Sequence, residues 1–521
     1  MIDAVLIAVS VSVALALSVS QSLISARIGS DHPVHLFLTR SIRDNGYRMF
    51  VRVPRLLNAA YCGALPQYLH WILAHMGRAA LRRSERLLNP VVNTMHVALF
   101  AVAAWFAARS AGLPAIYIGL ATCAFALTPQ FYHALSARNF GLSSRGVGLL
   151  LLTLFFCAAY AAQSELAALP SWAALALFGW LIWGFSTFAQ QALCIISVIL
   201  LLMARMWVPA TGALLGLAIF ISLHPRYSLG YLWHTLRFNA TYRRELAPIF
   251  MLSVRRSIWR DLVFDIWKKL PRNLTTGVHY AYGNAVLIVL LLNPLAPIAA
   301  AAVLTGALPR QGFLGYAGQL ALAGLVAMLL TSFRATRFLG EPERYVEAMT
   351  PWMVLAAAAV LYSHGLQTLL ALTAPLFLLI DLAQLQASNM LLKHTASQAL
   401  QLRDVEQAID QRLAGGVRFC CNNEHLTKLL MRHDWDFAYC LAVGQDYCGM
   451  KLQEAFSSFP LLRRSACELI VKTYRINACL LDRQVFESLF DELPRGLRSA
   501  SVAYESPRLR LLILDWDQMG L

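Results

Sequence analysis

Charged residues are scarce in this chain of 521 residues, at 14%, whereas hydrophobic residues make up 58%. An ordinary soluble protein has roughly a quarter of its residues charged, so a soluble fold is excluded for most of the chain. The sequence also has no CxxC pair or other zinc spacing, no internal repeat and no low-complexity segment. The lack of repeats weakens a transporter interpretation, because many transporter folds consist of inverted repeats.

Apolar runs long enough to cross a bilayer, about 20 residues each, recur through the first three-quarters of the chain. About eleven such runs predict an all-α polytopic membrane bundle. They are 4–25, 91–109, 114–134, 147–164, 171–187, 191–204, 207–223, 284–304, 315–332, 346–363 and 366–385. The first run has Asp3 as its only early charge and lacks a basic leader, so it predicts a retained span rather than a cleaved signal.

The net charge of +16 belongs entirely to this membrane part. Residues 386–521 hold 16 basic and 16 acidic residues. All but three of the other basic residues lie in four segments, which the span count places on one side of the bilayer. These segments are 27–90, 135–146, 224–279 and 333–345. Such a cationic face attracts anionic lipid or a lipid phosphate, or serves only to set topology. Nucleic acid is not expected as a partner, because the basic and aromatic residues form no recognisable binding module.

The first loop, 27–90, contains two amphipathic stretches. Apolar residues recur at helical spacing over 33–48, which predicts a helix that lies at the interface with its apolar side in lipid and ends at Asn45-Gly46. A second stretch covers 66–75. Segment 224–279 alternates aromatic with basic residues, as interfacial segments do. We therefore expect juxtamembrane amphipathic helices in both places.

The sequence predicts two domains, a membrane module at 1–385 and a small soluble α/β domain at 386–521, which we call the tail. A polar helix is expected over about 386–413, where Gly415-Gly416 ends it. Short apolar runs then alternate with helical segments. The runs are 417–421, 476–481 and 509–514, and the helical segments lie near 424–432 and 461–474. Six tail cysteines could form disulfides outside the cytoplasm, and the sequence does not give their pairing. They are Cys420, Cys421, Cys440, Cys448, Cys467 and Cys479.

Three polar clusters fall in loops of the predicted cationic face. They comprise Asp31 with His32 and His35, the run Arg138–Gly146, and the run Arg334–Tyr345. Asp31 follows the first span, where a carboxylate is costly unless it is solvated or paired. It is either a functional residue or the cap of the helix that begins near Pro33.

Chemistry on a lipid-phosphate leaving group needs a carboxylate base for the acceptor hydroxyl and cations for the departing phosphate. Asp31 fits the base. The arginines of the other two clusters fit the phosphate site: Arg138, Arg145, Arg334, Arg337 and Arg344. Glu341 and Glu343 could orient the acceptor or hold an arginine, or form only an exposed ion-pair cluster. His32 and His35 could join Asp31 at a metal, although capping or interfacial histidines are the commoner case.

This layout resembles the GT-C-fold integral-membrane glycosyltransferases, which include protein O-mannosyltransferases, oligosaccharyltransferases and bacterial cell-envelope glycosyltransferases. The resemblance is in the layout of 1–385, in Asp31 with the helix after it, and in the run Phe338–Tyr345. It implies an inverting enzyme that moves a sugar from a polyprenyl-phosphate carrier to an envelope glycan, lipid or protein acceptor. The catalytic residues are then Asp31, Glu341 and Glu343, and the substrate- or phosphate-binding residues are His32, His35, Arg138, Arg145, Arg334, Arg337, Arg344 and Tyr345.

Two departures from this family leave the donor sugar and a divalent-metal requirement open. His32 follows Asp31 where mannosyltransferases typically have an Asp-Glu pair, and the second loop lacks a DxD motif. No cofactor is predicted with certainty, and no metal ligand is assigned. The resemblance implies a bacterial inner-membrane protein whose active face and tail are extracytoplasmic. The positive-inside rule would instead place the cationic face in the cytoplasm.

Two other functions compete with the enzyme. A transporter or flippase for an anionic lipid-linked substrate predicts ionisable groups in mid-span. The spans are expected to be nearly free of charge, with only Asp381, Glu165 and Arg205 near their ends. A non-catalytic membrane scaffold, whose tail binds a partner, predicts that removing the carboxylate of Asp31 leaves function intact.

Overall fold

A computed structural model places most of the chain in two compact units. The described residues are 2–25, 32–58, 65–132, 141–166, 168–241, 244–245, 259, 262, 264, 266–269, 284–333, 335–336, 339–413, 415–440, 448–458, 460–483 and 500–516. The helical unit comprises 1–26, 82–225 and 251–388. The loop–tail unit comprises 27–81, 226–250 and 389–521. The first loop therefore lies with the tail, as does the start of segment 224–279.

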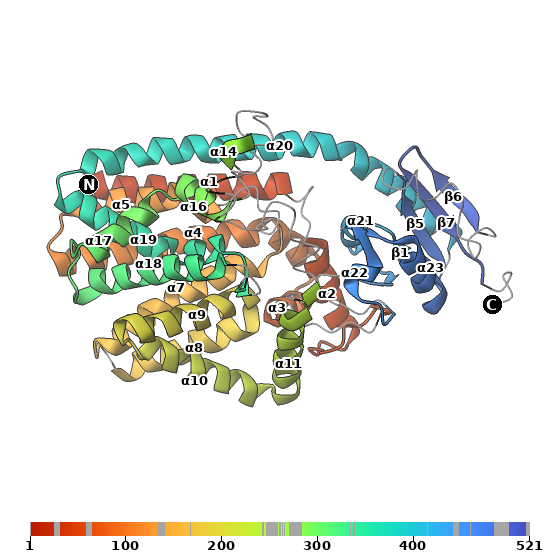
Figure 1. Cartoon of the computed structure of the whole chain (residues 1–521), viewed down its shortest axis with the longest axis horizontal. Coiled ribbons are helices and arrows are strands. Elements are labelled where there is room, and N and C mark those ends of the chain that lie inside the picture. Colours follow the sequence, from red (N-terminus) through yellow and green to blue (C-terminus); the bar gives the residue numbers. More distant parts are fainter. Residues whose placement is uncertain are drawn as a thin grey trace. The chain divides into compact units, whose positions relative to one another are not determined.

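The helical unit is a bundle of apolar helices, many of which run side by side in Figure 1. Its helices are α1 (Ile2–Ser25), α4 (Arg78–Ala111), α5 (Ala115–Leu127), α6 (Pro129–Tyr132), α7 (Ser144–Gln163), α8 (Ala168–Phe185), α9 (Thr187–Ala204), α10 (Val208–Leu223), α14 (Ile266–Lys269), α16 (Ala285–Leu292), α17 (Leu295–Leu304), α18 (Gly312–Thr331), α19 (Glu343–Ser363) and the part of α20 (Gln367–Arg412) up to residue 388. The most extensive contacts join α18 to α19, α8 to α7 and α10, and α1 to α5.

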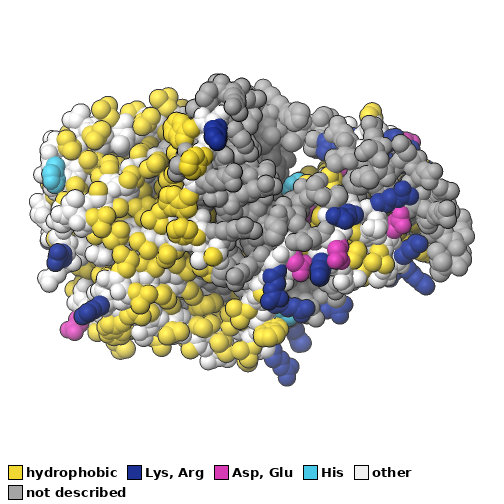
Figure 2. Space-filling model, viewed as in Figure 1, with side chains coloured by type: hydrophobic (Ala, Val, Ile, Leu, Met, Phe, Trp, Pro, Cys, Tyr) yellow, Lys and Arg dark blue, Asp and Glu magenta, His cyan; other side chains and the backbone are white. Residues whose placement is uncertain are grey.

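Eight helices of the described chain are long and apolar enough to cross a membrane. A ninth span is formed if α16 and α17, which meet at a bend of 96°, count together. The bend falls at Asn293-Pro294, where proline cannot continue the helical hydrogen bonding. Helices α5 and α10 are apolar but shorter, so each predicted apolar run contains an apolar helix among its described residues. The visible face of this unit carries mostly hydrophobic side chains, as lipid contact requires (Figure 2). The predicted polytopic helical fold is confirmed.

Small residues let α8 and α10 approach closely. Gly212 and Gly216 are spaced as GxxxG on α10, and a Cβ on Gly216 would lie 2.3 Å from the carbonyl carbon of Gly179 on α8. A Cβ on Gly212 would meet Leu175 at 2.4 Å. Without a hydrophobic driving force between helices in lipid, this close contact supplies the van der Waals attraction that joins the pair.

The loop–tail unit is built on a mixed sheet with the predicted alternation of strands and helices. It contains α2 (His32–Asp44), α3 (Tyr68–His75), α11 (Pro225–Thr241), β1 (Arg418–Cys421), α21 (Glu424–Leu430), β2 (Asp436–Phe437), α22 (Leu452–Ala455), β3 (Phe456–Ser458), β4 (Leu461–Leu462), α23 (Arg464–Thr473), β5 (Ala478–Asp482), β6 (Ser501–Glu505) and β7 (Leu509–Ile513). The strand order is β2-β1-β5-β7-β6, with β1 parallel to β2 and β5, and β7 antiparallel to β5 and β6. Strands β3 and β4 form a separate antiparallel pair.

Helix α2 is part of the tail's hydrophobic core. Its apolar residues lie in one cluster with residues of β1, β2 and α21, and the ring of Phe37 meets that of Phe437 edge-on at 5.8 Å. The apolar residues of α2 are Val34, Phe37, Leu38 and Ile42, all buried. The prediction that this side of the helix lies in lipid is therefore wrong. The same helical periodicity suits a protein core and a bilayer equally well, so the pattern alone does not distinguish them. Its predicted end is confirmed by Gly46, which has φ +64°.

A second part of the first loop pairs with the sheet edge. The backbone N–H of Leu57 donates to the carbonyl of Phe437 at 2.9 Å, and the N–H of Phe437 donates to the carbonyl of Arg55 at 2.9 Å. This bridge runs parallel to β2. Arg55 also pairs with Asp44 at 2.8 Å and Asp434 at 3.4 Å. The loop therefore satisfies backbone groups that an exposed edge strand would leave open.

Candidate functional site

The late loop between α18 and α19 makes a tight, polar turn. Gly340 adopts φ +123°, a conformation that residues with a Cβ rarely take. The guanidinium of Arg344 then donates to the Glu341 carboxylate at 2.6 Å, and the hydroxyl of Tyr345 donates to the carbonyl of Leu339. The predicted option that a glutamate of this loop holds Arg344 is confirmed in geometry. The turn is thus fixed by its own side chains.

A buried ion pair lies one helical turn further on. Arg145, at the start of α7, donates to the carboxylate of Glu347 in α19. The side chains are 9% and 0% exposed, so both charges are almost completely removed from water. The backbone N–H of Arg145 donates to the side chain of Ser143, which caps α7. Two charges in such a setting stabilise each other only with good geometry, and either one alone would be costly.

Phe188, at the start of α9, lies against both arginines. The guanidinium carbons of Arg145 and Arg344 are 5.5 and 5.7 Å from its ring centroid, within the range of cation–π attraction. From α6, the side-chain amide of Gln130 donates to the carbonyl of Glu343 at 3.2 Å. The late loop and three helices, α7, α9 and α19, therefore contribute to one group, which we call the late-loop cluster. It comprises Arg145, Phe188, Glu341, Glu343, Arg344 and Glu347.

The N-termini of α7, α9 and α19 supply the residues of this cluster. Each helix N-terminus carries a partial positive charge, which favours anions nearby. The cluster holds three carboxylates and two guanidiniums. Glu343 and Glu347 are each 3% exposed, whereas the side chain of Arg344 keeps 17% of its surface accessible. Arg344 is therefore the cation of the cluster that is better placed to meet an anionic ligand, and Arg145 is committed to Glu347.

The histidines of the first loop lie in the other unit. His32 begins α2 and is partly buried, and the Nδ1 atom of the buried His35 lies 2.8 Å from Nε2 of His70 in α3. Nδ1 of His70 lies 3.2 Å from the carbonyl of Pro66, which only accepts, so this nitrogen carries the proton and His35 donates to His70. Burial, with His35 nearby, holds the pKa of His70 well below its usual value. The contact between the two rings joins α2 to α3 while His70 is uncharged.

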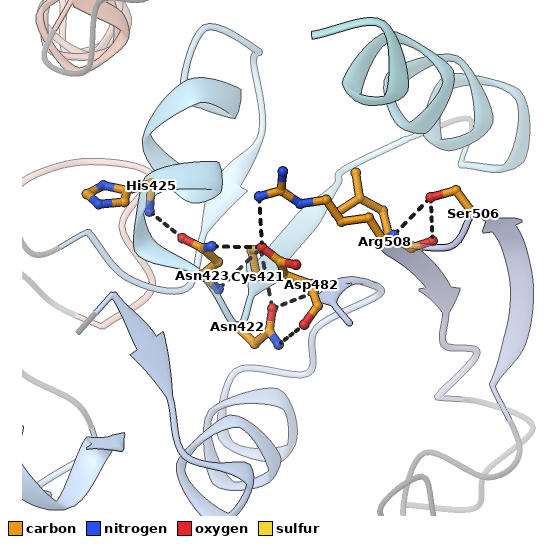
Figure 3. Close-up of polar contacts among 8 residues, drawn as sticks. Cys421, Asn422, Asn423, His425, Asp482, Ser506 and Arg508 are labelled. Atoms are coloured by element: carbon orange, nitrogen blue, oxygen red, sulfur yellow. Dashed lines mark hydrogen bonds and ion pairs between the residues drawn. The ribbon is translucent and has the colours of Figure 1, made fainter. Parts of the chain in front are cut away.

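A third polar network closes the carboxyl ends of β1 and β5 (Figure 3). Asn423 and Arg508 donate to the Asp482 carboxylate at 2.9 and 3.3 Å, and Asn422 accepts from the backbone N–H of Asp482 at 2.8 Å. The chain leaves β1 for β2 on one side and returns to β5 on the other, so this is the position where ligands bind in many open α/β sheets. Here Asp482 is 1% exposed and the side chains bind one another. These contacts hold the ends of β1 and β5 together.

Several predicted site residues lie outside the described residues, so the structure does not test their roles. They are Asp31, Arg138, Arg334 and Arg337. Of the others, one group meets in the late-loop cluster or next to it, and His32 and His35 lie in the loop–tail unit. The residues that meet are Arg145, Glu341, Glu343, Arg344 and Tyr345. No group of three or more His, Cys, Asp or Glu side chains among the described residues is arranged to hold a metal ion.

Sequence reasoning missed Glu347, Phe188 and His70. Glu347 falls inside a predicted span, where its charge was a signal that pointed to a partner, since a lone ionised group at that depth is costly. It lies four residues after Glu343 and therefore on the same helix face. No sequence signal distinguished Phe188 or His70 from ordinary core residues.

Comparison with known proteins gives the fold. No family model and no curated protein matches the sequence. The structure is similar to that of the oligosaccharyltransferase from Archaeoglobus fulgidus, solved in complex with zinc and sulfate, with a TM-score of 0.51 and 13% identity over 91% of this chain and 68% of that one. It is also similar to ArnT from Cupriavidus metallidurans, solved bound to undecaprenyl phosphate and in the apo state, with TM-scores of 0.44 and 0.43, 14% identity and 97% of each chain covered.

The chain therefore has the fold of the GT-C integral-membrane glycosyltransferases, with a small α/β region at its C-terminal end. The resemblance inferred from the sequence is confirmed at the level of the fold. Fold does not fix the reaction, which depends on the side chains of the site.

Proposed function

We propose that this protein is a membrane glycosyltransferase that moves a sugar from a polyprenyl-phosphate-linked donor to an envelope glycan, lipid or protein. The observation that carries the proposal is the late-loop cluster within a GT-C fold. Arginines, carboxylates and three helix N-termini meet there, at the end of spans that lipid-linked substrates could follow. Such a setting stabilises negative charge on a departing phosphate because its donors are already oriented.

In this proposal the late-loop cluster holds the lipid phosphate and Asp31 acts as base. Arg344 contacts the phosphate, helped by Arg138, Arg334 and Arg337, which flank the same two loops in the sequence. These additional cations would outweigh the three carboxylates of the cluster. Arg145, paired with Glu347, positions the start of α7. Asp31 takes the proton of the acceptor hydroxyl while the sugar carbon is attacked from the face opposite the phosphate, which gives inversion.

The first test is a lipid extract of cells that lack the protein. The substrate should accumulate as a lipid-linked sugar detectable by mass spectrometry, and the wild-type gene should remove it. The Asp31→Asn variant should insert into the membrane and fold normally, but cells that produce it should still accumulate the lipid-linked sugar. Full complementation by a well-expressed Asp31→Asn variant would overturn the role of Asp31 as base.

The second test concerns the phosphate site. Arg344→Ala should raise the KM for the lipid-linked donor at least tenfold, because a hydrogen bond to a charged group contributes about 1.5–3 kcal/mol. Arg310→Ala is the matched control, since Arg310 is exposed in the loop between α17 and α18 and lies outside the basic segments. The KM for the acceptor should change little in both variants. Equal losses for donor and acceptor with Arg344→Ala would count against a phosphate role.

Helix α11 supports the placement of segment 224–279 at a membrane surface. Tyr227 and Tyr231 are buried, and the Tyr227 hydroxyl accepts from the backbone N–H of Gln67 at 3.0 Å. Large apolar side chains line the exposed side at helical spacing. They are Leu229, Trp233 and Leu236, at 55%, 66% and 66% exposure. With α10 ending at Leu223, we place α11 on the bilayer. In the same proposal the protein is a multi-pass protein of the bacterial inner membrane whose active face and tail are extracytoplasmic.

One observation favours the transporter or flippase as a second candidate. Asp381, within the apolar part of α20, is 2% exposed, and neither of its carboxylate oxygens has a hydrogen-bond partner among the described residues. Buried ionisable groups in spans often mark transport pathways. Purified protein in vesicles separates the two functions. Movement of a lipid-linked sugar between leaflets that Asp381→Asn abolishes would support transport, whereas sugar transfer that this variant leaves intact would support the enzyme.

A further inference from the structure

Three cysteines of the tail meet in one hydrophobic core. Cys420 lies on β1, Cys479 on β5 and Cys467 on α23, and all three belong to the core cluster on the α23 side of the sheet. Their exposures are 1%, 0% and 2%. All cysteines of the described part of the chain are free thiols. Three thiols packed together are more than a set of small apolar side chains, because any two of them can join.

Strand register brings the first two together and separates a fourth. Cys420 is paired with Cys479 in the ladder between β1 and β5, so their side chains leave the sheet on the same face. Cys421, the next residue of β1, points to the opposite face and lies in the other core with residues of α2 and α21. The fold therefore buries three of the six tail cysteines together in this core, and Cys448 packs against the same core as a partly buried residue.

The three thiols also interact directly. Hydrogen bonds from Cys420 and Cys479 lower the pKa of Cys467 well below its usual value, and the hydrogen bond with Cys467 raises that of Cys420. These hydrogen bonds link Cys467 to both strand thiols in the folded domain. Cys467 lies on α23, which packs against β1, the strand that carries Cys420. A bond from a helix to a strand also has more geometric freedom than a bond between two adjacent strands.

We propose that the tail contains a disulfide site in which Cys467 joins Cys420 when the domain meets a disulfide oxidant. Cys467 attacks one sulfur of the oxidant, for example glutathione disulfide, and releases one thiol of that reagent. Cys420 then displaces the second thiol. The two cysteines lose two protons and two electrons, which the oxidant gains as its disulfide becomes two thiols. Because these thiols are buried, the exchange takes place while the domain folds or opens.

The bond would join helix α23 to β1, an inner strand of the five-stranded sheet. It would close a loop of about 45 residues, which restricts the unfolded chain. Oxidation should therefore raise the melting temperature of the tail by about 10 °C or more. The site itself does not depend on the proposed enzyme function. Only its oxidation in the cell depends on the extracytoplasmic placement of the tail.

The test uses the full-length protein in detergent, with the tail opened by urea and refolded in a glutathione redox buffer. Free thiols are then blocked, and the protein is digested with trypsin without reduction. Cys420, Cys467 and Cys479 fall on three different tryptic peptides, 419–428, 465–472 and 476–483, so the mass of a linked pair identifies the bond. The expected product joins 419–428 to 465–472, and reduction should separate it.

Alanine variants decide which cysteine of the first peptide takes part. Cys421→Ala is the matched control, because it removes the neighbouring thiol on the other face and should leave the linked pair intact. Cys420→Ala and Cys467→Ala should each abolish it while the tail still resists proteolysis. A bond lost in Cys421→Ala, a bond from 465–472 to 476–483, or no bond after refolding would each overturn the pairing. If the bond forms on refolding but the thiols of protein purified from cells are reduced, the pairing is supported. Only the extracytoplasmic placement of the tail is then contradicted.

Discussion

Replacing Glu347 by glutamine should destabilise the helical unit far more than a typical substitution. The change leaves the guanidinium of Arg145 buried beside a neutral amide, with only 9% of its side chain exposed. Removing one partner of a buried ion pair costs about 3–5 kcal/mol, because the remaining charge keeps its desolvation penalty and loses its attraction. Arg145→Met should have a similar effect, since it strands the carboxylate of Glu347.

The double variant Arg145→Met/Glu347→Leu separates this reasoning from simple loss of packing. When both charges are replaced by apolar side chains of similar size, the desolvation penalty disappears together with the attraction. Such replacements are often neutral or stabilising. The double variant should therefore be more stable than either single variant and close to the wild type, with a coupling energy of several kcal/mol.

Thermal unfolding of the protein in detergent, followed by gel filtration of the soluble fraction, measures these effects. Each single variant should lower the melting temperature by roughly 5–15 °C, as a loss of this size implies for a large domain. The double variant should recover most of that fall. A double variant as unstable as the sum of the two single ones would refute the idea that unpaired charge is the cause. The same idea would be refuted if both single variants melted within about 1 °C of the wild type.

Three further outcomes follow from packing and protonation. Gly216→Ala should cost about 1–3 kcal/mol, because its methyl group would lie 2.3 Å from a backbone carbon of α8, whereas Gly77→Ala, with nothing within 4 Å, should be harmless in the same thermal assay. The loop–tail unit should lose stability as the pH falls below about 6.5, by at most about 1.4 kcal/mol per pH unit, because the unfolded chain binds a proton at His70 that the folded chain excludes. His70→Gln should flatten that dependence in urea titrations. Phe37→Ala should cost about 3–5 kcal/mol and make the tail sensitive to protease, while the exposed Val502→Ala should not.

The apolar helices were predictable because each helix that can cross a bilayer needs its own apolar run. About 20 apolar residues are required at every crossing, so the eleven runs could be read without knowing how the helices pack. The breaks inside runs were not visible in the same way. Helices α16 and α17 are separated by Asn293-Pro294, and α5 ends at Leu127 before α6 begins at Pro129. A hydropathy average crosses such interruptions because one or two residues change it little.

The polar site was predictable only in part. The late-loop residues Glu341, Glu343 and Arg344 are close in sequence, so their cluster followed from the sequence alone. Arg145 lies about 200 residues before its partner Glu347, and no sequence pattern in either segment indicates that the two side chains pair. Strands β1, β5 and β7 and helices α21 and α23 followed from alternation, whereas β2, β3, β4, β6 and α22 were not predicted. The membership of α2 in their core did not, because it depends on a contact between opposite ends of the chain.

That long-range contact has a consequence for how the molecule is made. A ribosome delivers Phe37 early and Phe437 only after about 400 further residues, including nearly all of the spans. Until then the apolar side of α2 is not packed against the tail, so chaperones can bind it and it can cause aggregation. The tail, which is translated last, thus buries a helix that is translated near the start. A chain truncated just before residue 418 should insert into the membrane but be degraded faster than the full-length protein, because the apolar side of α2 stays exposed.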